Sequence, residues 1–244
     1  MKNILLIGGT GEAVQINKEL SGWKDFTLVT SLAGRTLNPT TLLGDVLLQG
    51  FTEHGGLDQF LAHRKIDLVI DASHPFAAGM SQKAVEICGS QKIPLIRYHR
   101  KPWVREGRDW LEVDNLGEAA SSLISFKRIF LTIGRQELKS FSGLIDKFFL
   151  TRSIEDIEFE PAGSVVHHVR SRGPFSVEDE IALMTENKID VIVSKNSGGE
   201  ATFAKIIAAQ SLSIPVVMVK RPPLHAAKVV FDLPSLYSEI RLSF

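Results

Sequence analysis

The chain has 244 residues, enough for one large domain or two smaller ones at roughly 150 residues per domain. Hydrophobic residues make up 44% and charged residues 23%, a soluble globular composition that excludes a disordered chain and a small disulfide-stapled fold. The 28 basic residues balance the 28 acidic ones, so no general excess of charge attracts nucleic acid or an anionic membrane, and any anion site must be local.

The amino-terminal residues lead directly into a strand pattern. Residues 4–7 are apolar, but the run is too short for a signal-peptide core. No segment has the roughly 18 consecutive apolar residues that a membrane helix requires. Cys88 is the single cysteine, so no internal disulfide can form. We therefore expect a soluble, cytoplasmic protein in a reducing compartment.

Short runs of Val, Ile and Leu alternate with segments of helical spacing along the whole chain, which predicts an α/β fold with parallel sheets. The two halves also repeat each other. The strand patterns at 4–8 and 66–70 recur at 129–134 and 189–193, and their starts are separated by 62 and 60 residues. Ile-Pro at 93–94 recurs at 214–215, and both copies precede a basic-proline step.

The repeat predicts two similar Rossmann-like domains related by internal duplication. We place the boundary near Lys127, with a dinucleotide-binding domain over residues 1–127 and a substrate-binding domain over residues 128–244. Ligands of such sheets bind beyond the carboxyl ends of the strands. The residues that follow each strand are therefore the candidate site, and an active cleft is expected between the domains.

A glycine-rich turn follows the first strand. Small residues let the backbone turn tightly and approach a pyrophosphate, while the next helix presents its N-terminal N–H groups. Val14 stands where a full dinucleotide motif has its third glycine, so a purely structural turn remains the alternative. The candidate cofactor residues in this turn are Gly8, Gly9, Thr10, Gly11 and Glu12.

The second strand ends in hydroxyl groups and an arginine. Thr30, Ser31 and Arg35 stand where an NAD-binding protein usually has an acidic residue for the ribose. An arginine can instead bind a 2′-phosphate through several donors. This composition favours NADPH as the cofactor, with NADH as the alternative. If Arg35 binds no cofactor, it is simply a solvated arginine in a loop.

The strand at 68–70 is followed by Ser73, His74, Pro75 and Phe76. A histidine here can titrate near neutral pH and serve as a proton donor or contact a nicotinamide. It could equally hold the turn before the proline. We assign Ser73, His74 and Pro75 to the cofactor and Phe76 to the substrate.

The strand ends of the second half carry cations, amides and glycines, which suit an anion. The candidate substrate-binding residues are Gly134, Arg135, Arg172, Lys195, Asn196, Ser197, Gly198 and Gly199. Ser176 and Asp179 have the spacing of a helix cap, so Asp179 and Glu180 are poor catalytic candidates.

Several chemistries lack their motifs. Neither tyrosine has a lysine four residues later, and no P-loop, nucleophile elbow or H-E-x-x-H pattern occurs. His167 and His168 lie in an expected strand, where neighbouring side chains point to opposite faces, so they should not share a metal ion.

Taken together, the motifs resemble the precorrin-6A reductases of corrin-ring (vitamin B12) biosynthesis, including the cobalt-precorrin-6A reductases of the anaerobic route. The resemblance spans nearly the whole chain. It is carried by residues 8–13, 30–36, 71–77, 131–138, 172–175 and 195–199 in this order.

The resemblance implies transfer of a hydride from reduced nicotinamide to a double bond of precorrin-6A, giving precorrin-6B, with no metal in the site. Its substrate is a tetrapyrrole with many carboxylates, which the cationic strand ends would meet. The implied catalytic residues are His74, as proton donor, and Lys195, as a cation that stabilises developing charge. No nucleic acid or membrane partner is implied, and no motif bears on the oligomeric state.

Three alternatives stay open from the residues alone. One is a cobalt-precorrin-6A reductase that uses NADH. A second is a non-catalytic NAD(P)-binding sensor, which would use the same glycine turn without needing a site for a large anion. Another NAD(P)-linked reductase or epimerase of a small molecule is a third class, and the missing Tyr-x-x-x-Lys motif argues only against its commonest form.

Overall fold

The structure is a computed structural model that describes residues 1–32, 42–105 and 110–244. The chain forms two compact units. The first comprises Met1–Lys101 together with Pro222–Phe244, and the second comprises Pro102–Arg221. The structure thus divides the chain differently from the predicted boundary at Lys127, because the chain passes between units twice, at the two basic-proline steps.

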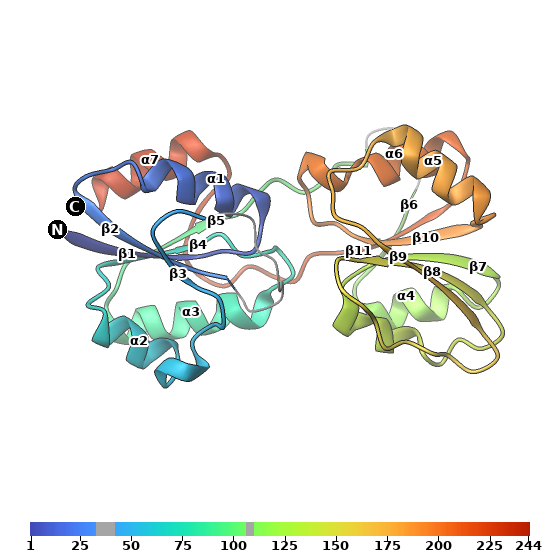
Figure 1. Ribbon diagram of the computed structural model, residues 1–244, viewed down its shortest axis with the longest axis horizontal. Coiled ribbons are helices and arrows are strands. Elements are labelled where there is room, and N and C mark those ends of the chain that lie inside the picture. The colour runs from blue at the N-terminus through green and yellow to red at the C-terminus, as the bar shows by residue number, and fades with distance from the viewer. Residues whose placement is uncertain (33–41, 106–109) are drawn as a thin grey trace. The chain divides into compact units, whose positions relative to one another are not determined.

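The first unit contains a parallel sheet of six strands among the described residues, in the order β12-β5-β4-β1-β2-β3 (Figure 1). These strands are β1 (Lys2–Ile7), β2 (Phe26–Ser31), β3 (Asp45–Leu47), β4 (Leu68–Asp71), β5 (Leu95–Tyr98) and β12 (Lys228–Val230). β1 is connected to its neighbour β2 through α1 (Gly11–Leu20), and β4 to its neighbour β5 through α3 (Ala78–Gln91), as is usual for parallel strands.

Both faces of this sheet are covered, because successive side chains of a buried strand point to opposite faces. Ile4 and Leu6 pack in a cluster with α1 and α7, whereas Leu5 and Ile7 pack with α2 and α3 (Figure 1). The helical segments are α1 (Gly11–Leu20), the short 3₁₀ turn η1 (Thr52–His54), α2 (Leu57–His63), α3 (Ala78–Gln91) and α7 (Leu233–Leu242). The unit is therefore a three-layer α/β sandwich.

The second unit repeats this plan in its described residues, with the strand order β6-β11-β10-β7-β8-β9. Its strands are β6 (Trp110–Val113), β7 (Arg128–Thr132), β8 (Phe148–Ser153), β9 (Val165–Arg170), β10 (Val191–Lys195) and β11 (Val216–Val219). Its helical segments are α4 (Leu116–Ser122), η2 (Arg135–Phe141), α5 (Val177–Glu186), η3 (Glu200–Thr202) and α6 (Ala204–Ser211).

The duplication predicted from the sequence is visible in detail. Asp67, which lies just before β4, accepts the backbone N–H of Asn3 at 2.8 Å. Its counterpart Asp190, which lies just before β10, accepts the backbone N–H of Arg128 at 3.0 Å. Lys65 and Lys188, which precede the two Ile-Asp pairs, both have φ of 48°. The repeated Ile-Asp pair therefore joins the same two neighbouring strands in each unit.

The sixth strand of each repeat is exchanged. β6 and α4 come from the first half of the sequence, yet β6 pairs with β11 of the second unit. β12 comes from the second half and pairs with β5 of the first unit. Each exchanged strand lies at the edge of the sheet that it joins.

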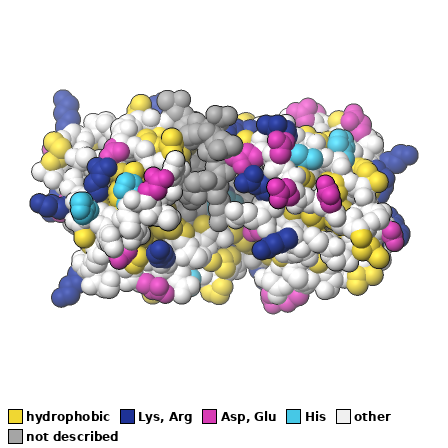
Figure 2. All heavy atoms as spheres, turned by 60° about the horizontal axis from the view of Figure 1, so that its bottom comes forward, with side chains coloured by type: hydrophobic (Ala, Val, Ile, Leu, Met, Phe, Trp, Pro, Cys, Tyr) yellow, Lys and Arg dark blue, Asp and Glu magenta, His cyan; other side chains and the backbone are white. Residues whose placement is uncertain are grey.

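The surface and the helices show the ordinary features of this composition. On the face drawn in Figure 2, acidic and basic side chains are interspersed. Within the described ranges, none of the helices combines the length and apolar character needed to cross a membrane.

Candidate active site

The carboxyl ends of β1, β2 and β4 are neighbours in the first sheet. Ile7 pairs with Ser31 on one side and with Asp71 on the other. The glycine turn, the end of the second strand and the His74 segment therefore lie along one edge, as predicted from the parallel pattern.

The glycine turn is held in place by hydrogen bonds to its neighbours. Gly8 donates its N–H to the Ser31 carbonyl at 2.8 Å, and Gly9 has φ of +125°, which favours glycine. Thr10 caps α1 by accepting the N–H of Ala13 at 3.1 Å, and its hydroxyl donates to the carbonyl of Ala72 at 3.0 Å. The turn is thus tied to both neighbouring strands.

Open space surrounds the two glycines that would approach a ligand. Among the described residues, a Cβ built at Gly9 or at Gly11 meets no heavy atom within 4 Å. A Cβ at Gly8 would instead contact Ala13 and Leu32 at 3.4 Å. The space at Gly8 is therefore already lined by protein atoms, whereas Gly9 and Gly11 leave room for a phosphate group beside the helix N-terminus.

Glu12 forms an ion pair with Arg100. The guanidinium donates to both carboxylate oxygens, at 3.0 and 3.1 Å, and both side chains are mostly buried. This pairing offsets a negative charge that would otherwise repel a pyrophosphate at the start of α1.

The end of β2 differs from the expectation for Thr30. Its side chain is fully buried, and its hydroxyl accepts a hydrogen bond from the Asn17 amide at 2.9 Å. Ser31 is also buried. Thr30 therefore serves the packing of α1 against β2 rather than a cofactor contact, and Arg35 lies outside the described residues.

Asp71 organises the end of β4. One of its carboxylate oxygens accepts the Ser73 N–H at 3.1 Å, and the other accepts the Ser81 hydroxyl at 2.6 Å and Arg97 Nε at 3.1 Å. Asp71 and Arg97 are both buried. This network holds the loop that carries His74.

His74 is half-buried in that loop. Its Nδ1 accepts the backbone N–H of Phe76 at 3.3 Å, and the two rings lie 5.9 Å apart. This bond leaves the Nε2 position for the proton of the neutral ring. His74, Ser73 and Pro75 also line a small cavity together with Arg97.

In the second unit, the ends of β7 and β10 are neighbours, since Thr132 pairs with Ser194. Lys195 Nζ donates to Glu137 Oε2 at 2.6 Å, and the same oxygen accepts the Gly134 N–H at 2.9 Å. The structure thus brings Gly134 and Lys195 together through an acid that the sequence analysis did not select.

Asn196 has a different role from the predicted anion cradle. Its side chain accepts the Trp103 N–H at 2.8 Å and donates to the Trp103 carbonyl at 3.0 Å. The Trp103 indole donates to the Gly199 carbonyl at 3.0 Å. Asn196 and Gly199 therefore fasten the connecting segment, and Ser197 is buried beside them. Gly198 has φ of +65° in this turn.

The two predicted arginines of the second unit lie at its surface. Arg135 is exposed and pairs with Glu155 at 2.9 Å, and Arg172 is exposed in the segment before α5. Ser176 caps α5 by accepting the Asp179 N–H at 3.0 Å, which confirms the cap prediction. His167 and His168 contact Asn187 and Thr151, respectively, so the two rings have different partners.

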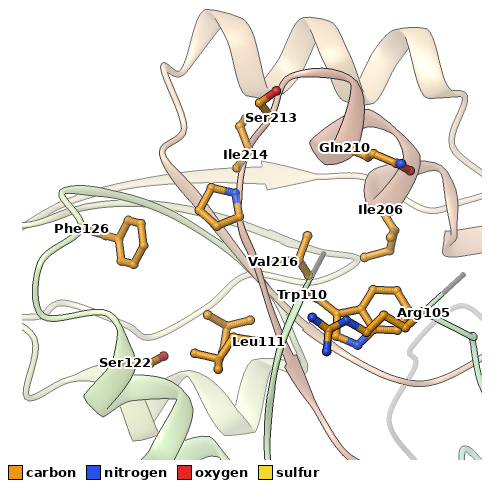
Figure 3. Close-up of a pocket in the computed structure, with 12 residues that line it drawn as sticks. Arg105, Trp110, Leu111, Ser122, Phe126, Ile206, Gln210, Ser213, Ile214 and Val216 are labelled. Atoms are coloured by element: carbon orange, nitrogen blue, oxygen red, sulfur yellow. The ribbon is translucent and has the colours of Figure 1, made fainter. Parts of the chain in front are cut away.

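A larger cavity, of about 630 Å³, lies at the opposite edge of the second sheet. Figure 3 shows Trp110, Leu111 and Val216 at the amino ends of β6 and β11 among its lining residues. Because ligands of parallel α/β sheets bind at the carboxyl ends, this cavity is separate from the candidate active site.

Sequence reasoning missed Arg97, Arg100 and Glu137. Arg97 carried a usable signal, because it is a charge within an otherwise apolar strand and pairs in register with Asp71. Arg100 and Glu137 became visible only when the fold brought them to the strand ends.

Comparison with known proteins agrees with this geometry. The family described as "Precorrin-6x reductase CbiJ/CobK" matches residues 3–240. A precorrin-6A reductase from Rhodococcus erythropolis is 42% identical over 95% of this chain and 94% of its own length. A cobalt-precorrin-6A reductase from Methanocaldococcus jannaschii is 28% identical over 98% of each chain.

A solved structure gives the same result. The structure titled "CobK precorrin-6A reductase" matches with a TM-score of 0.90 and 35% identity, covering 100% of this chain and 97% of that one. The match includes both six-stranded sheets. The chain therefore belongs to the precorrin-6x reductase family.

Proposed function

We propose that this protein is an NADPH-dependent precorrin-6A reductase of cobalamin biosynthesis, which reduces one double bond of the macrocycle to give precorrin-6B. Family membership and the curated relatives support a reductase of this class. The relative that is 42% identical is named for the metal-free substrate, whereas the cobalt-precorrin relative is 28% identical. This difference favours precorrin-6A over its cobalt form.

The observation that carries the cofactor proposal is the open space at Gly9 and Gly11. A Cβ at either position would occupy room beside the first turn of α1 and contact no atom of the residues that the structure describes. The sheet order, in which β1 lies between β2 and β4, places this turn centrally along the carboxyl edge. The first unit would therefore hold the pyrophosphate at this turn and the nicotinamide toward the end of β4.

When bound, a reduced nicotinamide supplies the hydride for the reduction. The chain itself must orient the reactants, limit water and provide a proton, because adding a hydride to a double bond leaves one proton to be supplied. His74 suits this task, since its Nδ1 accepts a backbone N–H and Nε2 is left to carry a proton.

Cationic side chains of the second unit would bind the substrate carboxylates. Lys195 is the last residue of β10, and Arg135 and Arg172 follow the ends of β7 and β9. Lys195 is held by Glu137 and Arg135 by Glu155, so these cations are already oriented. A substrate carboxylate would therefore bind to a cation that already has an acidic partner.

The preference for NADPH rests on the end of β2. Thr30 is buried against Asn17, which leaves Arg35 as the residue proposed to bind the 2′-phosphate. Replacing Arg35 by Ala should weaken NADPH binding and leave NADH binding unchanged.

Anaerobic turnover tests the proposal as a whole. Purified protein is mixed with precorrin-6A or its cobalt form, and oxidation of NADPH or NADH is followed by absorbance. We expect NADPH oxidation with precorrin-6A and formation of precorrin-6B. Turnover of only the cobalt form with NADH would replace this assignment by the alternative reductase. Cofactor binding without turnover of either substrate would support a sensor and overturn the proposal.

A further inference from the structure

Arg97 carries a buried donor that the protein itself does not satisfy. Its side chain on β5 is 4% exposed, and Nε donates to Asp71 Oδ2 at 3.1 Å. Nη2 is buried and has no hydrogen-bond partner among the residues that the structure describes. Burying a guanidinium nitrogen without an acceptor is unfavourable, so an acceptor from outside the chain is expected here.

Arg97 faces a small cavity at the carboxyl edge of the first sheet. The cavity lies beyond the ends of β4 and β5, and residues 222–225 also line it. Its polar lining includes Ser73, His74, Arg97, His99 and His225, together with the acidic residue Asp71. The cavity measures about 10 Å³, which is roughly the space that one water-sized group needs. A single polar group fits, whereas a ring does not.

The charge around Arg97 selects the type of acceptor. Asp71 already neutralises the guanidinium, since both side chains are buried and in contact. A second carboxylate would place two anions on one buried cation, which is unfavourable in a low-dielectric site. A neutral carbonyl oxygen satisfies Nη2 without that repulsion.

The cavity is also correctly placed for one end of a dinucleotide. β4 is next to β1 and β5 is next to β4, and neighbouring strands lie about 4.8 Å apart. A dinucleotide whose pyrophosphate lies at Gly9 and Gly11 extends its nicotinamide across these two strand ends.

We propose that Arg97 Nη2 binds the carboxamide oxygen of the nicotinamide, which enters the cavity while the ring stays outside. This inference rests on the proposed function and adds a cofactor-binding residue to it. The bond would fix the rotation of the nicotinamide ring and thus the face that it presents to the substrate.

Binding measurements with a matched pair of ligands test this role. NADPH carries the carboxamide, whereas 2′-phospho-ADP-ribose has the same phosphates without the nicotinamide. Arg97→Lys keeps a cation beside Asp71 but removes Nη2. We expect the Kd of NADPH to rise about tenfold or more in Arg97→Lys, corresponding to the loss of one hydrogen bond from a charged donor. The Kd of 2′-phospho-ADP-ribose should not change.

Arg64→Lys is the control variant. Arg64 also pairs with an aspartate of the first unit, Asp45, at 2.9 Å, but the pair is exposed. This substitution should leave both dissociation constants unchanged. An equal rise for both ligands in Arg97→Lys would show that Arg97 only maintains the strand ends, and no rise for either would show that Nη2 binds water alone. Both results overturn the inference.

A ligand-side measurement keeps the test decisive if Arg97→Lys folds poorly. The thionicotinamide analogue of NADPH replaces the carboxamide oxygen by sulfur, a weaker acceptor. It should bind the unaltered protein about tenfold more weakly than NADPH does, and equal binding would overturn the inference. If the unaltered protein binds neither NADPH nor 2′-phospho-ADP-ribose, the proposed cofactor itself fails, which is a different result.

Discussion

The carboxylate of Asp71 lies 3.1 Å from Nε of Arg97, and neither side chain is more than 4% exposed. Because Asp71 also accepts the Ser73 N–H and the Ser81 hydroxyl, one buried charge joins β4, β5 and α3. Breaking a buried pair by removing one charge is strongly unfavourable, since the other charge is left without compensation.

Asp71→Asn should therefore lower the free energy of unfolding by about 3–5 kcal/mol. Urea denaturation measures this change. Asp45→Asn is the matched control, because Asp45 pairs with Arg64 in the same unit but both side chains are over 40% exposed. The control should lose no more than about 1 kcal/mol. Equal losses in the two variants would refute a special role for the buried pair.

His74→Ala should slow reduction of precorrin-6A by about 10²-fold, as expected for the loss of a general acid. Single-turnover measurements of NADPH oxidation and product formation would show the effect. His63→Ala is the control, because His63 is an exposed residue at the end of α2. An unchanged rate in His74→Ala would assign the proton to solvent or to another group.

Gly11→Ala should separate cofactor binding from folding. Gly11 begins α1, and a Cβ there meets no atom within 4 Å in the described part of the chain, so the fold should tolerate alanine. The methyl group would nevertheless occupy the space through which a pyrophosphate approaches the backbone. We expect the Kd of NADPH to rise at least about tenfold, or 1.4 kcal/mol, in calorimetric titration.

Gly89→Ala is the control for this substitution. Gly89 lies within α3 and also has open space around a built Cβ. Alanine should stabilise that helix by about 0.5–1 kcal/mol and leave the Kd of NADPH unchanged. If Gly11→Ala binds NADPH as tightly as the unaltered protein, the pyrophosphate does not lie at this turn.

Lys195 and Glu137 should affect substrate binding in opposite directions. Lys195→Met removes a cation and should weaken binding of the polycarboxylated substrate, whereas Glu137→Gln removes the anion that competes for Lys195 Nζ at 2.6 Å. Each change should be about three- to tenfold and should shrink as salt is added. Equilibrium binding of precorrin-6A measures both, and changes in the same direction would exclude direct contact with Lys195.

The repeat was predictable because its signals are local. The Ile-Asp pairs at 66–67 and 189–190 mark the same strand in both units, and their aspartates make equivalent backbone bonds. The glycine turn was predictable for the same reason, since Gly9 has a backbone conformation that favours glycine.

The exchange of β6 and β12 was not predictable from the same patterns. An edge strand such as residues 110–113 has the same alternation whichever sheet it joins, and only the paths after Lys101 and Arg221 decide the pairing. Likewise, Thr30 and Asn196 have side chains suited to ligands. Their structural roles depend on Asn17 and Trp103, which the fold brings from elsewhere in the chain.

Asp67 should make stability depend on acid pH. The hydrogen bond from the Asn3 N–H, aided by Lys2, lowers the pKa of Asp67 below its ordinary value despite opposing desolvation. A carboxylate with a lowered folded-state pKa stabilises the fold above its unfolded pKa, near 3.9, and loses this contribution as pH falls through the folded pKa. Asp67→Asn should therefore be less stable than the unaltered protein at pH 7, and the difference should vanish in strong acid. Unfolding free energies measured between these limits test this expectation.

Lys2→Ala is the control, and it should lower the stability at pH 7 by less than Asp67→Asn does. Lys2 is exposed, and the hydrogen bond from the Asn3 N–H is the main cause of the lowered pKa of Asp67. An equal loss of stability in the two variants would instead make the surface ion pair responsible.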